Sequence, residues 1–282
     1  MRLSTALQYV LPHRFLSRVV YWATRWAWRP WKNFLISTIV KNYHVDMSQA
    51  EQTDPLAFPF FNAFFTRALK PGARTAPDDP NAIACPADGR ISQLGVIRDG
   101  RIMQAKGRDY SAAELLGDEA AASPYRDGHF ITVYLSPRDY HRVHMPLSGT
   151  LRETLHIPGR IFSVAPSAVD DVPNLFARNE RLVCNFDGER GPFAVILVGA
   201  LLVSGVETVW SGVEIPPYAR AIQRKSWTDR GIRLERFQEL GRFNMGSTAI
   251  VLFPSDTAEL DASLSPESQV KVGQSIGRIR RP

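Results

Sequence analysis

From Ala82 onward the chain is a succession of short apolar runs separated by glycine and proline, and this spacing restricts the possible fold strongly. Apolar runs of about four to eight residues bounded by turn residues are typical of β-strands, whereas helices need longer periodic segments. We expect strands at Ile91–Ile97, Phe130–Leu135, Leu151–Ile157, Leu182–Phe186, Phe193–Val203, Thr208–Val213, Ala249–Phe253 and Gln269–Val272.

One uncharged stretch and one helix-capping motif complete the fold prediction. The uncharged stretch from Phe193 to Val206 is rich in valine and contains two glycines, so buried strands explain it better than a membrane span. A short helix should begin at Ser111, because Ser111 and Glu114 form a capping box ahead of two leucines. We therefore expect an α+β, β-rich fold, with N-terminal amphipathic helices in residues 1–45 followed by a mainly antiparallel β domain in residues 46–282.

The positive charge of the chain is concentrated at its N-terminus. The formal net charge is +6, yet residues 1–45 contain seven Lys or Arg and no Asp or Glu, so the rest of the chain is slightly acidic at −1. This distribution argues against nucleic-acid binding by the main domain and indicates an anionic partner for the first segment. The two cysteines, Cys85 and Cys184, lie far apart in the chain, which favours reduced thiols over a disulfide.

An amphipathic helix is predicted between Arg14 and Arg29. Arginines and Tyr21 recur at helical spacing on one face, and an apolar set recurs on another: Phe15, Val19, Trp22 and Trp26. Pro30 is expected to interrupt this helix before a second apolar stretch, Trp31–Val40. No run is long and apolar enough to span a bilayer, and arginines interrupt every candidate signal-peptide core.

Four of the six tryptophans of the chain lie in one stretch of ten residues, Trp22–Trp31. Tryptophan favours the headgroup boundary of a bilayer, and arginine can reach anionic phosphates there. We interpret the segment as helices lying in the interface of an anionic membrane; the alternative is a helix packed on the main domain with its arginines in water. The residues expected to contact the membrane are Arg14, Arg18, Trp22, Arg25, Trp26, Trp28 and Trp31.

Ser247 follows Gly246 and enters the apolar run that begins at Ala249. A serine hydroxyl is a weak nucleophile until a base removes its proton, and a serine in a tight turn before a strand is the simpler interpretation. Gly246 favours a reactive role, because glycine permits unusual backbone conformations and hinders attack on its own carbonyl least. No G-x-S-x-G motif surrounds Ser247, so a lipase-type nucleophile elbow is not predicted.

Two histidines and one aspartate are the other candidates for chemistry. His141 and His144 lie between Pro137 and Pro146, where an irregular loop or a single turn is expected. They could be structural, or acid/base groups, since imidazole titrates near neutral pH. No carboxylate or cysteine completes a familiar metal-ligand set, so we predict no metal. Asp88, in a Pro-Ala-Asp-Gly sequence, could form a turn or orient a histidine.

Taken together, these motifs closely resemble phosphatidylserine decarboxylase of the short bacterial, membrane-associated, pyruvoyl-dependent type. The resemblance covers nearly the whole chain, and its motifs are specific in their order and spacing. One departure is Met245, where the family usually has leucine; the two side chains are close in volume. The matching segments are Leu7–Pro12, Phe61–Arg67, Pro86–Gly95, Gln104–Gly107, Tyr134–Pro146, Asn174–Arg181 and Gly241–Thr248.

The resemblance implies a chain that makes its own cofactor. The Ser247 hydroxyl would attack the Gly246 carbonyl, with His144 as base and Asp88 orienting His144. The chain would be cut into a β chain of residues 1–246 and an α chain of residues 247–282, and residue 247 would become a pyruvoyl group. This group would form an imine with phosphatidylserine, with His141 as proton donor or positioning group, and phosphatidylethanolamine would be released.

The resemblance also implies partners and a place in the cell. It implies phosphatidylserine as substrate, a homodimer of processed protomers, and a peripheral position on the cytoplasmic face of the bacterial inner membrane. Three other functions remain open: a membrane-associated serine hydrolase using Ser247, His144 and Asp88; a non-enzymatic membrane module; and a related decarboxylase of lipids with amino-acid headgroups.

Overall fold

A nine-stranded sheet forms the centre of the molecule in the part of the chain that the structure describes. The structure is a computed structural model that describes residues 2–201, 205–218, 220–245 and 247–280. Strand β13 (Arg233–Leu234) pairs with β7 beside the main path of the sheet. The order along that path is β12 (Gln223–Ser226), β7 (Gly149–Ile157), β8 (Arg181–Gly188), β9 (Gly191–Val198), β15 (Ser247–Phe253), β5 (His129–Leu135), β2 (Gly89–Val96) and β17 (Gln269–Val270).

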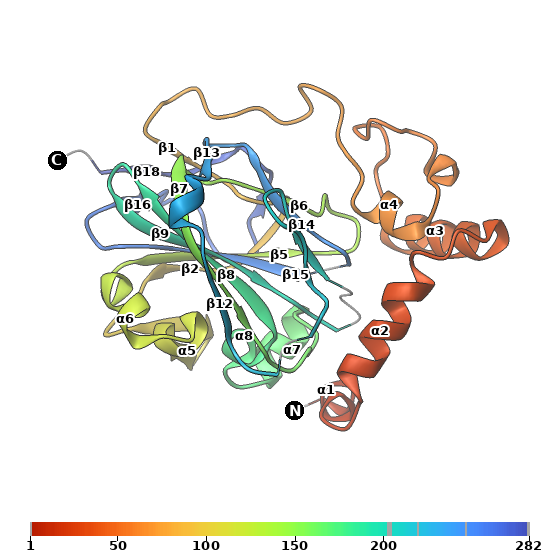
Figure 1. Ribbon diagram of the computed structural model, residues 1–282, viewed down its shortest axis with the longest axis horizontal. Helices are drawn as coiled ribbons and strands as arrows, with labels where there is room; N and C mark the ends of the chain where they lie inside the picture. Colours follow the sequence, from red (N-terminus) through yellow and green to blue (C-terminus); the bar gives the residue numbers. More distant parts are fainter. Residues whose placement is uncertain (1, 202–204, 219, 246, 281–282) are drawn as a thin grey trace.

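Smaller sheets and helices surround this sheet (Figure 1). Every pairing between the named strands is antiparallel, so the predicted β-rich α+β class is confirmed. A four-stranded sheet has the order β11 (Gly212–Ile215), β10 (Val206–Thr208), β14 (Glu239–Phe243) and β6 (Arg142–His144). A three-stranded sheet has the order β1 (Ala82–Ala84), β18 (Ser275–Ile279) and β16 (Ala258–Leu260), and β3 (Arg101–Ala105) pairs with β4 (Arg108–Ser111). The helices of this body are α5 (Ala112–Leu116), α6 (Glu119–Ala122), α7 (Pro166–Asp171) and α8 (Leu175–Arg178), with short 3₁₀ turns at Ser123–Tyr125 and Thr228–Arg230.

The core lies on both faces of the large sheet. In β15, Ala249 and Val251 pack with the two smaller sheets on one face, whereas Ile250 and Leu252 pack with α5, α7 and α8 on the other. Successive side chains of a strand point to opposite faces, so a strand covered on both sides must be apolar throughout. This explains why the segment forms an unbroken apolar run in the sequence.

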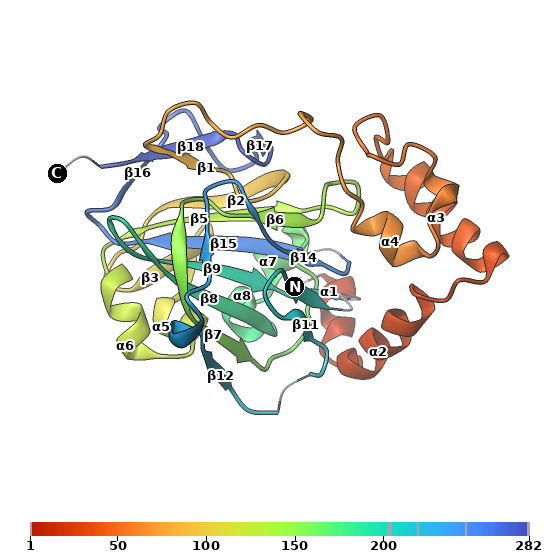
Figure 2. The same cartoon turned by 45° about the horizontal axis from the view of Figure 1, so that its top comes forward.

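The N-terminal segment consists of separate helices that lie along one side of the β body (Figures 1 and 2). The predicted continuous helix from Arg14 to Arg29 is wrong, because the helix ends at Ala23 and a new one begins at Arg29. Pro30 opens this second helix and does not interrupt the first, since a missing N–H costs little in the first helical turn. The elements are α1 (Leu3–Gln8), α2 (His13–Ala23), α3 (Arg29–Tyr43), a 3₁₀ turn (Pro55–Ala57) and α4 (Phe61–Phe65).

Helices α1 and α2 bury polar side chains, and the N-terminal segment exposes many apolar ones. The buried polar set is Thr5, Gln8, His13, Ser17, Thr24 and Lys32. The exposed apolar set is Leu7, Val10, Leu11, Phe15, Val19, Trp22, Trp26, Trp28 and Phe34, with Val10 79% and Trp22 72% exposed. A helix on a water-exposed surface normally has the opposite arrangement. None of the helices in the described residues is both long and apolar enough to cross a bilayer.

Most of the strand predictions are confirmed, but three strand predictions and one loop prediction need correction. The predicted Gln269–Val272 strand ends at Val270. Thr208–Val213 is not one strand, because β10 and β11 form a hairpin whose turn ends at Gly212 with a φ of 71°. The Phe193–Val203 strand ends at Val198, and its positions 202 and 203 lie outside the described residues. The expected loop or turn around His141 and His144 contains strand β6.

Two local predictions are confirmed. The Ser111 hydroxyl caps α5 by accepting hydrogen bonds from the Ala113 and Glu114 N–H groups, at 3.1 and 3.4 Å. Cys85 and Cys184 are both buried free thiols.

The Ile250→Ala substitution tests the two-sided core. Ile250 is fully buried against the helical face, so its truncation should lower the free energy of unfolding by about 2–5 kcal/mol. Val96→Ala, at an exposed site of the same sheet, should change it by less than about 0.5 kcal/mol. Urea unfolding of both variants in a Ser247→Ala background, which keeps one chain, measures the difference; equal losses would contradict this account of the core.

Candidate functional site

Ser247 is the first residue of the central strand β15 and is fully buried. Its backbone pairs with Leu135 of β5, and its hydroxyl has no hydrogen-bond partner among the described atoms. A buried hydroxyl without a partner is costly and is common at functional sites. Gly246, the other half of the predicted cleavage site, lies outside the described residues.

The loop that leads to Ser247 has an unusual backbone. Met245 has a φ of 100°, in the left-handed region that non-glycine residues rarely adopt. Its side chain packs against the buried cluster formed by α3 and α4, including Phe61 and Phe65. Asn244, just before it, is fully buried and donates its N–H to the Gly205 carbonyl at 2.8 Å. The protein therefore holds an unfavourable backbone conformation directly ahead of the candidate nucleophile.

His141 is a buried neutral imidazole beside α4. Its Nδ1 donates to the Asp139 carbonyl at 2.8 Å, because a carbonyl can only accept, and its ring lies 4.0 Å from that of Phe65. Burial lowers the pKa of His141 to about 3, and the charge of Arg67 acts in the same direction. Its Nε2 therefore carries a lone pair, with no partner in the described residues.

His144 is oriented by a backbone carbonyl and by a tyrosine. Its Nδ1 donates to the Phe237 carbonyl at 2.6 Å, which leaves Nε2 as the basic nitrogen. The Tyr140 hydroxyl lies 3.2 Å from this Nε2. Burial lowers the pKa of His144, so the ring is neutral and can accept a proton near pH 7.

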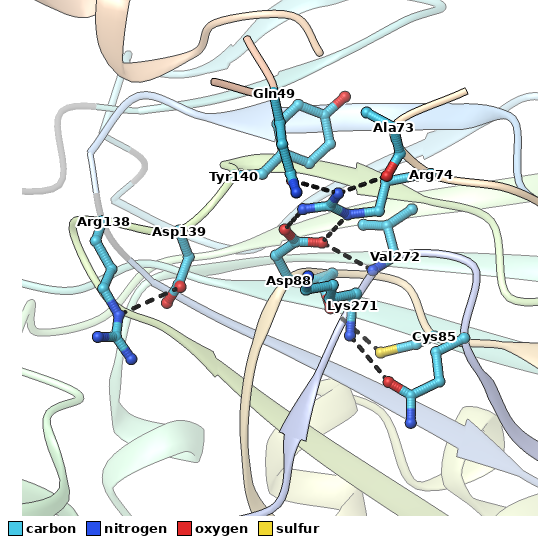
Figure 3. A network of polar contacts seen from close by, with 12 residues as sticks. Gln49, Ala73, Arg74, Cys85, Asp88, Arg138, Asp139, Tyr140, Lys271 and Val272 are labelled. Carbon is cyan, nitrogen blue, oxygen red and sulfur yellow. Dashed lines mark hydrogen bonds and ion pairs between the residues drawn. The ribbon is translucent and has the colours of Figure 1, made fainter. Parts of the chain in front are cut away.

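Groups other than a histidine bind the Asp88 carboxylate (Figure 3). Its carboxylate accepts two N–H groups of Arg74, one of them from Nε at 2.9 Å, and the Val272 N–H at 2.8 Å. Among the described contacts no hydrogen bond joins Asp88 to His144, although the His144 N–H bonds the Pro86 carbonyl at 2.8 Å. The role of Asp88 in orienting His144 thus stays a prediction.

Strand pairing shows which histidine lies at the end of β14 that leads to Ser247. The Phe243 N–H bonds the His141 carbonyl at 2.9 Å, whereas His144 pairs with Glu239 at the opposite end of β14. Since Phe243 is four residues before Ser247, the register places His141 at the Ser247 end of the strand. His144 is farther along β14, with Tyr140 on its basic nitrogen.

A cavity of about 270 Å³ opens next to Asp88 and Tyr140. Its lining contains four cations: Arg67, Arg74, Arg138 and Lys271. No sequence pattern pointed to Arg74, because it lies in an irregular segment after α4. Folding brings it into direct hydrogen-bond contact with Asp88. Arg142 does not line this cavity; it donates to the Glu239 carboxylate at 2.9 Å and to the Thr66 carbonyl at 3.0 Å. Within the described residues no group of three His, Cys, Asp or Glu could hold a metal ion.

The seven predicted membrane residues fall into two groups. Arg18, Trp22, Trp26 and Trp28 are exposed. The other three are partly buried and contact the protein itself. Arg14 lies 3.9 Å from Glu180, Arg25 covers the Tyr21 ring at 3.7 Å, and the Trp31 indole donates to the Ala23 carbonyl at 2.8 Å.

Comparison with known proteins gives a consistent result. The family model described as phosphatidylserine decarboxylase matches residues 61–278, and a second model, described as PSD, matches residues 3–44. A protein named phosphatidylserine decarboxylase proenzyme from Xanthomonas euvesicatoria pv. vesicatoria is 61% identical over 281 residues, which is 99% of each chain. A protein of the same name from Stenotrophomonas maltophilia is 57% identical over 280 residues, which is 99% of this chain and 100% of the relative. The chain therefore belongs to the phosphatidylserine decarboxylase family.

Proposed function

We propose that this chain is the proenzyme of a carboxy-lyase that converts phosphatidylserine to phosphatidylethanolamine after cutting itself between Gly246 and Ser247. The observation that carries this proposal is the buried, unpartnered hydroxyl of Ser247 at the head of β15, behind the strained Met245. The relatives are named as proenzymes, which is consistent with a chain that must be processed.

Ser247 fits the position of a self-made pyruvoyl group. Such a group supplies an electron sink for the carbanion left by loss of CO₂, which ordinary side chains lack. Ser247 lies in a water-excluded position, and pairing on β15 begins at this residue. A reactive group at this position would be shielded from bulk water and fixed in direction by the sheet.

Self-cleavage needs a base for the Ser247 proton. The hydroxyl oxygen attacks the preceding carbonyl, so the amide between residues 246 and 247 becomes an ester and the nitrogen of residue 247 becomes an amine. β-Elimination of this ester would release the carboxylate of residue 246 and leave a dehydroalanine at position 247, which water would convert to the pyruvoyl group with release of ammonia. His144 suits the base, because it is neutral and its Nε2 is the basic nitrogen. The Tyr140 hydroxyl on this Nε2 would have to move aside or pass the proton on.

The two fragments are expected to stay together after cleavage. The small fragment, residues 247–282, contributes β15, β16, β17 and β18. Within the sheets β15 lies between β5 and β9, β17 pairs with β2, and β18 pairs with β1, all of which belong to the large fragment. Separation would therefore expose the centre of the core.

His141 suits the later, decarboxylating step. Its low pKa makes it neutral before substrate binds, so its free Nε2 can accept a hydrogen bond from substrate. An anionic headgroup placed beside this ring would raise its pKa and favour the protonated form, which can return a proton to carbon. The role of His141 as donor or positioning group is thus compatible with its burial.

The inverted polarity of the N-terminal helices supports a position at a membrane surface. The exposed apolar set of this segment faces outward, while its buried polar side chains contact the protein. We place the protein peripherally on the cytoplasmic face of the bacterial inner membrane, where phosphatidylserine and other anionic lipids would attract Arg18 and the exposed tryptophans. A homodimer of processed protomers is part of the same proposal.

Intact mass under denaturing conditions tests self-cleavage. The purified protein should separate into a large fragment and one of 36 residues, roughly 4 kDa, whose first residue is pyruvoyl. The Ser247→Ala variant should remain one chain of 31.6 kDa. Vesicles containing phosphatidylserine should then release CO₂ with the cut protein and not with the variant. A wild-type chain that stays whole and is labelled at Ser247 by a fluorophosphonate would support a serine hydrolase in its place.

Separate substitutions of the two histidines test their division of labour. His144→Ala should slow self-cleavage by about 10²–10⁴-fold, the usual contribution of a general base. Because the pKa of His144 lies below 6.5, the wild-type cleavage rate should be flat above pH 7 and fall only in more acidic solution. His141→Ala should still be cut but lose CO₂ release. Time courses of chain mass and of CO₂ measure the two steps, and loss of both steps in both variants would refute the division.

Replacing the exposed tryptophans tests membrane contact. Trp22→Ser and Trp28→Ser should each weaken vesicle binding by about tenfold or more, because each removes a large apolar contact with the bilayer. Met103→Ser, which removes an exposed apolar side chain from the β body, is the matched control and should bind as the parent does. Co-sedimentation with anionic vesicles measures the binding, and an equal effect of all three substitutions would count against an interfacial N-terminal segment.

A further inference from the structure

A chain of buried amides leads from helix α4 to the loop that contains the proposed cleavage site. The Asn62 Nδ2 donates to the Asn244 Oδ1 at 2.9 Å, and the Asn244 Nδ2 donates to the Glu207 Oε1 at 2.8 Å. Asn62 is 6% exposed and Asn244 is fully buried. Asn62 and Asn244 are 182 residues apart in the sequence, so the contact exists only in the folded protein.

The far end of this chain is attached to the N-terminal segment. The Asn62 N–H donates to the carbonyl of Thr24, the residue that ends α2, at 2.9 Å. The neighbouring Arg25 lies 3.8 Å from the same Glu207 oxygen that Asn244 contacts. Helix α2, which presents Trp22 to the outside, is thus connected through α4 to the residue just before Met245.

Each link of the chain has a fixed hydrogen-bond direction. The Glu207 carboxylate can only accept, so the Asn244 amide must turn its NH₂ toward Glu207 and its oxygen toward Asn62. Asn62 must then donate. Buried hydrogen bonds with a single allowed direction fix the side chain, and the backbone N–H of Asn244 is fixed as well by the Gly205 carbonyl.

We propose that Asn62 is a positioning residue for self-cleavage, which acts through Asn244 to hold Met245 in the conformation that cleavage of the Gly246–Ser247 bond needs. The inference rests on the proposed function, because it concerns the same cleavage. The φ of 100° at Met245 needs support from its surroundings, and α4 supplies it twice, through the Asn62–Asn244 bond and through the packing of Met245 against the α3–α4 cluster. Asn62 makes no contact with Ser247 among the described interactions, so it acts through another residue.

The Asn62→Asp substitution tests this role with almost no change in shape. An aspartate cannot donate to the Asn244 oxygen, and rotation of the Asn244 amide would set its oxygen against the Glu207 carboxylate. Self-cleavage should therefore slow by at least tenfold. Adding Glu207→Gln allows every bond to reverse, because the new amide at position 207 can donate to the Asn244 oxygen while the Asn244 NH₂ donates to the new carboxylate at position 62. In the E207Q background, the Asn62→Asp change should therefore lower the rate of self-cleavage by less than threefold relative to E207Q alone.

The measurement is the time course of precursor conversion, followed by denaturing mass spectrometry of newly made full-length chain. Asn185→Asp is the matched control, since Asn185 donates to Glu153 at 3.0 Å in a part of the sheet remote from the cleavage loop. The Asn185→Asp variant should cleave itself at a rate within about twofold of the wild-type rate.

The outcomes separate this inference from the proposed function. A cut wild-type chain together with an N62D chain cut at the same rate overturns the inference alone. The inference is also overturned if Asn62→Asp lowers the cleavage rate by the same factor in the wild-type and E207Q backgrounds, because an equal loss would indicate general destabilisation. A wild-type chain that stays whole overturns the proposed function and the inference together.

Discussion

The structure depends on the pairing of β15 between β5 and β9 at the centre of the large sheet. This pairing buries every residue from Ser247 to Phe253 and fixes the direction in which residue 247 enters the core. Residue 247, at the first position of this strand, is fixed by the pairing on its C-terminal side. The chain can therefore be cut at this junction without loss of the sheet, because every ladder contact of β15 lies on the C-terminal side of the cut.

The electrostatics around this strand separate two sets of groups. Near Ser247 the buried His141 is neutral, and burial is the main reason. In the lining of the cavity Arg74 is paired with Asp88, and between β6 and β14 Arg142 is paired with Glu239. His144 and Tyr140 lie between these environments, and Tyr140 occupies the nitrogen that a base would use. In the proposed self-cleavage, Tyr140 would have to move aside or pass the proton on before His144 could take it from Ser247.

The sequence predicted those parts of the fold that local patterns determine. The Ala249–Phe253 strand was recognisable because both of its faces are buried and all of its residues are apolar. Strand β14 was missed, since Glu239–Phe243 mixes charged and small residues at the rim of the core. Motif resemblance named the candidate site residues Ser247, His141, His144 and Asp88, and their roles stay predictions. Neither resemblance nor periodicity revealed Arg74 or the Asn62–Asn244 bond, because these contacts arise from pairings between distant segments and leave no local pattern.

The N-terminal segment shows why composition and structure had to be combined. Its tryptophans and arginines suggested a membrane surface, yet three of the seven named residues contact the protein itself. The structure resolves this by polarity in α1 and α2, whose buried side chains are polar while many apolar side chains of the segment are exposed. Hydrogen bonds to Gln8, His13 and Thr24 bind these helices to the domain, whereas α3 also packs through the apolar Ile36. An apolar surface kept free in this way is available to a bilayer, and the same helices reach the cleavage loop through Thr24 and Asn62. In the proposed function, membrane attachment and formation of the reactive site would therefore share one structural support, the contact between α2 and α4.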